Sequence, residues 1–346
     1  MKGGKKMEIK VSNRIKVFSF FMTLIIIAHH TKMLLIAFTE KDNMLAQKVI
    51  TTVGQWVGFA MMYFFFITGF LLFRNLTLKT LGSKIKRRVH SLLIPYLLWQ
   101  LIAIVVFSLR GMSYTAEELI KTIFLFKKWP PNGPIWYVYI IFLLTFLSPL
   151  IMIFHKKKWS GMLLVFAGIA LARMNTWESF LGDSYLNNTI SFLPAYLLGA
   201  YWGRFYPEMK DVSDLKDATL LILIGIFLQG VIPDILNSVV LMIMPVMIMH
   251  FLPVDNWLEN PNVAVLCDST FFLYANATIL YPFIALGAYR IFIYLFYDTW
   301  LQDIFGKLSV ILMNIVISVL LCEILKRVMP KLLIILTGGR SHPECR

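Results

Sequence analysis

Long apolar runs alternate with short polar and basic segments along almost the whole chain. About 20 apolar residues in a helix cross the hydrocarbon core of a bilayer, and a helix satisfies its own backbone hydrogen bonds there. The pattern therefore predicts an all-α, polytopic membrane bundle with about ten transmembrane helices. The predicted spans cover about 15–37, 47–73, 91–110, 134–155, 159–173, 189–206, 217–232, 235–253, 263–287 and 305–326. Because the loops are too short for a second catalytic module, we expect one membrane domain over residues 1–346.

The composition agrees with a membrane protein. Hydrophobic residues make up 58% of the 346 positions and charged residues 15%, whereas about a quarter of the residues in soluble domains are charged. The mean hydropathy is +0.72. The three cysteines have no metal-binding or disulfide spacing, and neither a Walker loop nor a GxGxxG, HExxH or GxSxG motif is present. The sequence thus predicts no metal site and excludes the familiar soluble-enzyme motifs.

The formal net charge of +14 comes from short basic tracts between the apolar runs. With a cytoplasmic N-terminus, the loops after the even-numbered spans are also cytoplasmic. Four of these five loops are basic, and only 254–262 has no basic residue. This is the pattern of the positive-inside rule. We therefore expect both termini, including the basic segment 1–14, in the cytoplasm, and the charge needs no nucleic-acid partner.

The first predicted span carries a polar stripe. Ionisable groups inside a membrane are costly and are by default candidates for function. At 100° per residue, Ser19 and His30 differ by about 20° around the helix axis and by about 16 Å along it. Lys16 and Thr23 lie near the same line. Histidine titrates near neutral pH, so His30 can deprotonate a hydroxyl or accept an acyl group itself, and we expect it to be catalytic.

The basic segment from Arg74 to Arg88 has two interpretations. It is an orientation signal, and it can also be an anion site, because guanidinium groups bind phosphates bidentately. A coenzyme A thioester would fit such a site. His90 and His155 flank basic tracts and are expected to be solvated. Asp268, near the start of the ninth span, can pair with a cytoplasmic arginine.

Several segments together resemble the membrane-bound acyltransferase 3 family of bacteria. Their order and their positions in the spans follow the family over nearly the whole chain. The matching segments are Arg14–Lys16 leading to Ile27–His30, Phe64–Leu72, Lys84–Trp99, Pro134–Tyr139 with Leu147–Leu150, Ser269–Ala275, and Thr337–Arg340.

The resemblance implies an acyltransferase of the bacterial inner membrane with both termini in the cytoplasm. Such proteins move an acyl group, commonly acetyl from acetyl-coenzyme A, onto a hydroxyl of an extracytoplasmic glycan. The implied partners are the lipid bilayer, acyl-coenzyme A as a donor substrate and a glycan or glycolipid acceptor, with no permanently bound cofactor. His30 would be the essential histidine of the first span. The residues implied to hold the donor are Arg74, Arg87, Arg88 and Lys16, and those implied to support the site are Ser19, Thr23, Trp136 and Tyr139.

The sequence also departs from the family pattern. Ser19 occupies a position where an arginine is common, and we expect Lys16 to supply the missing cation. Many relatives have WFLRDL in the fourth span, where this chain reads WYVYII over 136–141. Many also have a histidine in the ninth span, where Asn276 and Ala277 stand here. A transporter or exporter of a small organic anion or glycan lipid, and an inactive relative, are the alternative interpretations.

Overall fold

The computed structural model describes residues 9–35, 44–126, 130–174, 186–209, 216, 234–295 and 300–340. Within these ranges, all regular secondary structure is helical, which confirms the all-α fold. The elements in chain order are α1 (Ile9–Leu35), α2 (Met44–Phe73), α3 (Leu78–Arg88), η1 (Val89–Leu93), α4 (Ile94–Leu109), α5 (Ala116–Ile123), α6 (Trp136–Phe146), α7 (Ser148–Phe154), α8 (Lys158–Arg173), α10 (Leu186–Phe205), α12 (Asp234–Phe251), η2 (Asp255–Glu259), α13 (Pro261–Asp268), α14 (Thr270–Leu295), α15 (Trp300–Val328) and α16 (Pro330–Thr337).

The described residues contain five helical segments that are long and apolar enough to cross a membrane, or six if the bent pair α6 and α7 is one span. The five segments are Ile9–His30, Trp56–Phe73, Leu78–Leu109, Thr270–Gly287 and Leu308–Val328. The polytopic membrane bundle is thus confirmed, but the described residues do not reach the predicted count of about ten. Helices α8, α10 and α12 lie at three further predicted spans. Helix α8, with 16 residues, is too short to be counted, α10 is not among the segments that qualify, and the part of α12 at Val239–Phe251 is a shorter apolar helix. The predicted span at 217–232 lies outside the described residues.

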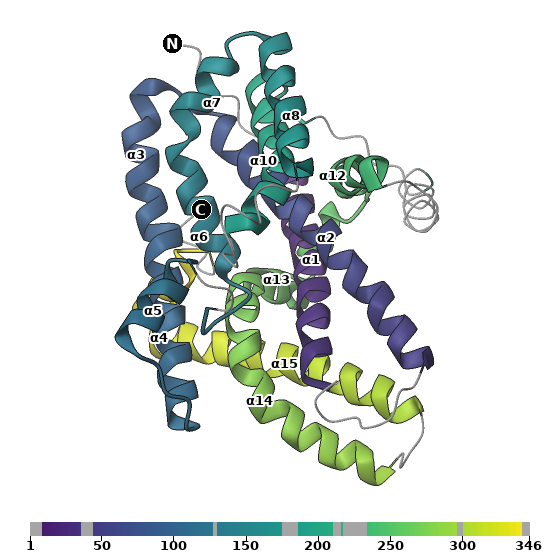
Figure 1. Cartoon of the computed structure of the whole chain (residues 1–346). Coiled ribbons are helices and arrows are strands. Elements are labelled where there is room, and N and C mark those ends of the chain that lie inside the picture. The colour runs from purple at the N-terminus through teal and green to yellow at the C-terminus, as the bar shows by residue number, and fades with distance from the viewer. Residues whose placement is uncertain are drawn as a thin grey trace.

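Helix α2 lies at the centre of the bundle, where it crosses α10 and also contacts α1 and α12 (Figure 1). Three glycines make the crossing with α10 close. A Cβ atom on Gly199 would overlap the Phe66 carbonyl, and one on Gly203 would overlap the Phe70 carbonyl. Gly69 of α2 lies equally close to the Tyr196 carbonyl. Small residues four apart let helix backbones approach in this way within membranes.

The basic segment 74–88, expected to be a loop, is helical over α3. Thr77 caps this helix: the Thr80 amide donates to Thr77 Oγ1 (3.2 Å), and the Thr77 amide donates to Thr80 Oγ1 (3.0 Å). Lysine and arginine are good helix formers, so a capped basic run continues as helix. Helices α3, η1 and α4 therefore form one long rod (Figure 1). The loop prediction was wrong, because basic character marks the orientation of a segment and does not determine its backbone.

Two predicted spans are broken. The predicted span at 134–155 bends by 57° between α6 and α7, where Pro149 stands in the first turn of α7. A proline disfavours continuous helix before it. The predicted span at 263–287 is divided at Ser269 into α13 and α14. This second break places the end of α13, with Asp268, beside α1.

Candidate functional site

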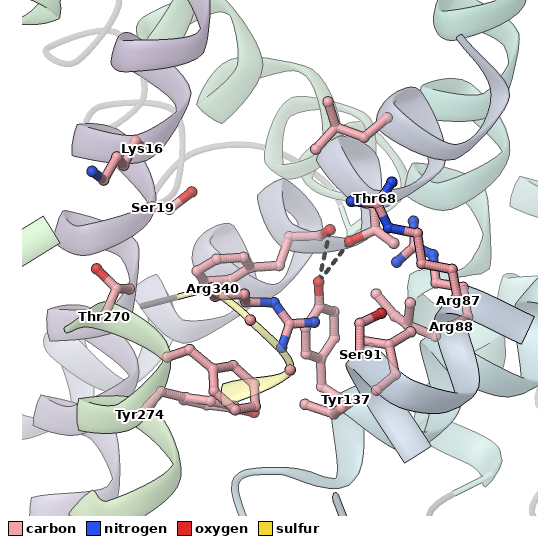
Figure 2. A pocket seen from close by; sticks show the side chains of 18 of the residues that line it. Lys16, Ser19, Thr68, Arg87, Arg88, Ser91, Tyr137, Thr270, Tyr274 and Arg340 are labelled. Carbon is pink, nitrogen blue, oxygen red and sulfur yellow. Dashed lines mark hydrogen bonds between the residues drawn. The ribbon is translucent and has the colours of Figure 1, made fainter. Parts of the chain in front are cut away.

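A cavity of about 1160 Å³ lies between α1, α2, α3, η1, α6, α14 and the segment that follows α16 (Figure 2). Its lining runs along α1 from Ser12 to Ile26, so it occupies the N-terminal part of that helix. Polar lining residues come from α1, from the end of α13, from α3 and from the C-terminal segment. The charged members of the lining are Lys16, Lys84, Arg87, Arg88, Asp268 and Arg340.

One wall of the cavity is basic. Arg87 and Arg88 come from the last turn of α3, and Lys84 from one turn earlier. Lys84 Nζ donates to the Leu72 carbonyl (2.9 Å), which fixes the end of α3 against the end of α2. The rod continues from Arg88 into the wider π-helical turn η1, and such turns are frequent at functional sites. The sequence thus presents three cations to one cavity from a single helix.

The opposite wall carries the single acid found among the described lining residues. Asp268, at the end of α13, forms a salt bridge with Lys16 of α1, and both side chains are partly exposed to the cavity. The expected arginine partner for Asp268 is therefore wrong, because the break at Ser269 brings its carboxylate to α1. Since Asp268 is paired with Lys16, the cations of the basic wall have no carboxylate partner in the described lining.

Tyr137 of α6 lies in the cavity between Arg340 and the basic wall. Its hydroxyl donates to the Phe64 carbonyl (3.0 Å) and shares a hydrogen bond with Thr68 Oγ1 (2.9 Å), both on α2. Figure 2 shows the Tyr137 ring between Arg340 on one side and Arg87 and Arg88 on the other. The hydrogen bonds to α2 hold this ring in place between the guanidinium group of Arg340 and those of Arg87 and Arg88.

A model of the acyltransferase 3 family, described as an acyltransferase domain, matches residues 15–323. The chain belongs to the acyltransferase 3 family. It is accordingly a multi-pass membrane acyltransferase, and the match includes α1 from Ile15 onward, the basic wall and Asp268. The comparison with curated proteins and the comparison with solved structures gave no match. Helix α16 and Arg340 lie beyond the matched segment.

The structure of this acyltransferase brings together five of the nine site residues that the sequence predicted. Lys16, Ser19 and Thr23 lie in the cavity wall on α1, opposite Arg87 and Arg88. Ser19 Oγ donates to the Ile15 carbonyl (2.7 Å) and shares a hydrogen bond with the Tyr63 hydroxyl (3.1 Å). The helical stripe therefore faces the cavity over its first half.

His30 is absent from the described residues that line the cavity. It follows the last lining residue of α1, Ile26, by four positions, which is about 6 Å along the axis. Its ring lies edge-on to that of His29, with the centroids 5.4 Å apart. The predicted catalytic residue thus lies one turn beyond the cavity, toward the other end of α1.

Three other predicted residues also lie outside the described lining. Burial lowers the pKa of Arg74, while the nearby charge of Glu208 acts in the opposite direction. Trp136 contacts Phe65 and Phe192, and Tyr139 stacks on Tyr96 with the ring centroids 5.1 Å apart. Trp136 and Tyr139 therefore pack helices against each other and are not among the described lining residues.

Sequence reasoning missed Tyr137, Thr68, Lys84 and Arg340. Tyr137 and Thr68 lie within quoted family motifs, but only the packing of α6 on α2 shows which positions face inward. Arg340 stands in the last quoted motif, after the final predicted span. No local pattern indicated that the chain would return to the cavity there.

His155 was expected to be solvated, and this prediction was wrong: the side chain is only 1% exposed. It follows α7 and lies against Phe73, Tyr201 and Phe205. A Cβ atom on Gly161 would lie 2.6 Å from its Cδ2 atom, so the imidazole fills the space that this glycine leaves. Neither ring nitrogen has a hydrogen-bond partner among the described residues. The lysine tract beside it is solvated, but the histidine itself turns inward.

Acidification is expected to destabilise the protein through His155. Burial lowers the pKa of His155 to about 4, from an ordinary value of about 6.5; the backbone of Ile151 acts in the opposite direction, and the charge of Arg204 adds a smaller lowering. The unfolded chain therefore binds more protons between these values, so the free energy of unfolding falls as pH drops from about 6.5 to 4. Thermal unfolding in detergent should show a smaller loss over this range for His155→Leu than for the wild type. His90→Leu, which removes an exposed histidine, is the control. A parallel loss in wild type and His155→Leu would contradict the prediction.

Proposed function

We propose that this membrane acyltransferase transfers an acetyl group from acetyl-coenzyme A to a hydroxyl of a cell-surface or exported glycan. The charge of the cavity supports this donor. Lys84, Arg87, Arg88 and Arg340 line it, while the single described acid, Asp268, is paired with Lys16. Coenzyme A carries a 3′-phosphate and a diphosphate, which are the groups that guanidinium ions bind best. Ligand pockets commonly measure about 300–1,000 Å³, so a cavity of about 1160 Å³ has room for an extended donor.

The position of the cavity supports a donor that enters from the cytoplasm. The basic wall faces the N-terminal part of α1 across the cavity, and the charge distribution of the sequence favours a cytoplasmic N-terminus. In a bacterial inner membrane, the acceptor glycan would then approach from the other end of α1, where His30 lies. The thioester arm of the donor would extend along α1 past Thr23 and Ile26, with its nucleotide part against the basic wall.

The proposed chemistry is acyl transfer assisted by His30. The imidazole accepts the proton of the acceptor hydroxyl while the hydroxyl oxygen attacks the thioester carbonyl. The new carbon–oxygen bond replaces the carbon–sulfur bond, and coenzyme A leaves as a thiol after it receives the proton from His30. In the covalent variant, the imidazole nitrogen first takes the acetyl group and then passes it to the hydroxyl. Both routes give the same products.

The test uses the purified full-length protein in lipid nanodiscs with acetyl-coenzyme A that carries label in the acetyl group. Free thiol and labelled glycan are measured together across a panel of surface polysaccharides and their lipid-linked precursors. We expect coenzyme A release that depends on the glycan, with label recovered in the glycan as an ester. Absence of thioester turnover with every acyl donor would contradict the proposal. Export of a labelled organic anion or glycan lipid from vesicles without such turnover would favour a transporter.

A further inference from the structure

The chain after the last long helix returns to the cavity. Pro330 begins α16, which packs against α4 and η1. Leu333 and Leu336 are buried in this contact, and Trp99 Nε1 donates to the Leu336 carbonyl (2.9 Å). The end of α16 is therefore held by apolar burial and by a buried hydrogen bond, so the position of the residues that follow it is fixed.

Two glycines then turn the chain into the cavity. Gly338 and Gly339 have φ values of 60° and 80°, a region that glycine adopts without steric cost. A Cβ atom on Gly338 would lie 2.5 Å from the Ser91 carbonyl oxygen in η1. A side chain at this position would push the segment away from η1. The turn therefore depends on glycine both for its backbone conformation and for its close contact with the basic rod.

This turn places Arg340 in the cavity (Figure 2). Its guanidinium carbon lies 4.4 Å from the centre of the Phe271 ring, and Nη1 donates to the Thr337 carbonyl (3.0 Å). The side chain lines the cavity and is accessible to a ligand within it. Burial by the surrounding protein, and secondly the charge of Arg88, lower the pKa of Arg340 to about 10. The guanidinium remains protonated at neutral pH.

Two like charges thus lie near each other across the Tyr137 ring. Among the described residues, neither Arg88 nor Arg340 forms an ion pair, and the Arg88 side chain donates no hydrogen bond to the protein. Each guanidinium has five N–H donors, so most of these donors have no acceptor among the described residues, and both side chains line the cavity. Two such cations repel each other, and an anion that lies between them would remove the repulsion and accept the free donors.

We propose that Arg88 and Arg340 form a two-arginine clamp that binds phosphate of the acyl-coenzyme A donor, with the Gly338–Arg340 turn closing the clamp around it. This inference rests on the proposed function, because it assigns phosphate-bearing donors to the cavity. Arg340 is then a donor-binding residue supplied by the C-terminal segment, outside the part of the chain that the family model matches.

The test compares a donor with phosphates and a donor without them. Acetyl transfer or hydrolysis is measured with acetyl-coenzyme A and with S-acetylpantetheine for the wild type, Arg340→Gln and Arg340→Lys. Arg327→Gln is the matched control, since it removes an exposed arginine from the last turn of α15. Loss of one charged hydrogen-bonding partner is expected to lower kcat/KM for acetyl-coenzyme A about 10- to 100-fold. Arg340→Lys should recover part of this loss, because it keeps the charge but not the bidentate geometry.

The two donors separate a binding role from a folding role. Arg340→Gln should leave kcat/KM for S-acetylpantetheine unchanged, whereas a misfolded variant would lose activity toward both donors. Equal activity of Arg340→Gln and wild type toward acetyl-coenzyme A, or equal losses toward the two donors, would overturn the clamp. A wild type that turns over neither donor would instead contradict the proposed function. Gly338→Val gives a second check: it should lower kcat/KM for acetyl-coenzyme A alone, because it displaces Arg340 without changing its charge.

Discussion

Replacement of Arg88 by Glu is expected to raise the KM for acetyl-coenzyme A on the order of 100-fold or more. The substitution removes a guanidinium from the basic wall and adds a negative charge beside Arg87, where the donor phosphates are proposed to bind. The protein should remain folded, since the Arg88 side chain makes no hydrogen bond or ion pair with the described residues. Steady-state kinetics over a range of donor concentrations would give KM and kcat, and direct binding of coenzyme A would give Kd.

The size of the effect should depend on geometry as well as on charge. Arg88→Lys keeps the cation but not the planar fork, so its KM should lie between those of the wild type and Arg88→Glu. Arg327→Glu makes the same change of charge on α15 outside the cavity and should leave KM unchanged. If Arg327→Glu and Arg88→Glu raised KM equally, the basic residues would act only through the general surface potential, and the cavity would not be the donor site.

The polar stripe on α1 was predictable because it needs only the regular geometry of one helix. Lys16, Ser19 and Thr23 recur at positions that the 3.6-residue repeat places on one face, and the structure places all three in the cavity wall. Their partners were not predictable in the same way. Asp268 reaches Lys16 only because Ser269 divides a predicted span, and that break has no strong signature in the sequence.

The contribution of Arg340 to the cavity could not be predicted from the sequence, for a different reason. Arg340 enters the cavity through the packing of α16 on α4, which joins residues more than 200 positions apart, as in the Trp99 hydrogen bond to Leu336. Local propensity carries no information about such a contact. The pair of glycines at 338 and 339 was a usable signal, since adjacent glycines mark a turn. Such a pair is consistent with a bend there, but only the fold shows that the bend brings Arg340 to the cavity.

The departures from the family pattern fall in two different parts of the fold, one in the cavity and the others in a contact between helices. Ser19 lines the cavity, so the arginine missing there is a change within the site, and Lys16 supplies a cation on the same wall. Asn276 instead donates to Ser318 (3.3 Å), and the Ala277 carbonyl accepts from Asn314 (2.9 Å), both on α15. These two positions belong to helix packing. A changed residue at 277 therefore alters the contact between α14 and α15 and does not remove a group from the cavity.

Replacement of His30 by Ala is expected to abolish acetyl transfer while the donor still binds. General acid–base catalysis contributes about 10²- to 10⁴-fold to rate, so kcat should fall by at least that order. The Kd for coenzyme A should stay at the wild-type value, because His30 lies one turn beyond Ile26 and outside the described lining of the donor cavity. For Arg88→Glu we expect the opposite result, because that substitution weakens donor binding, whereas His30→Ala lowers kcat and leaves the Kd unchanged. Labelled-glycan formation and coenzyme A binding, measured on the same preparation, distinguish the two.

His29→Ala is the matched control, since it removes the neighbouring imidazole about 100° around the helix from the polar stripe. It should retain turnover if the role depends on the face that His30 shares with Ser19 and Thr23. Normal transfer by His30→Ala would show that another group accepts the proton. Asp268 would then be the candidate, because its carboxylate lies in the cavity beside Lys16. Loss of donor binding together with turnover would show that the imidazole also holds the donor, and the expected separation of donor binding from proton transfer at His30 would then be wrong.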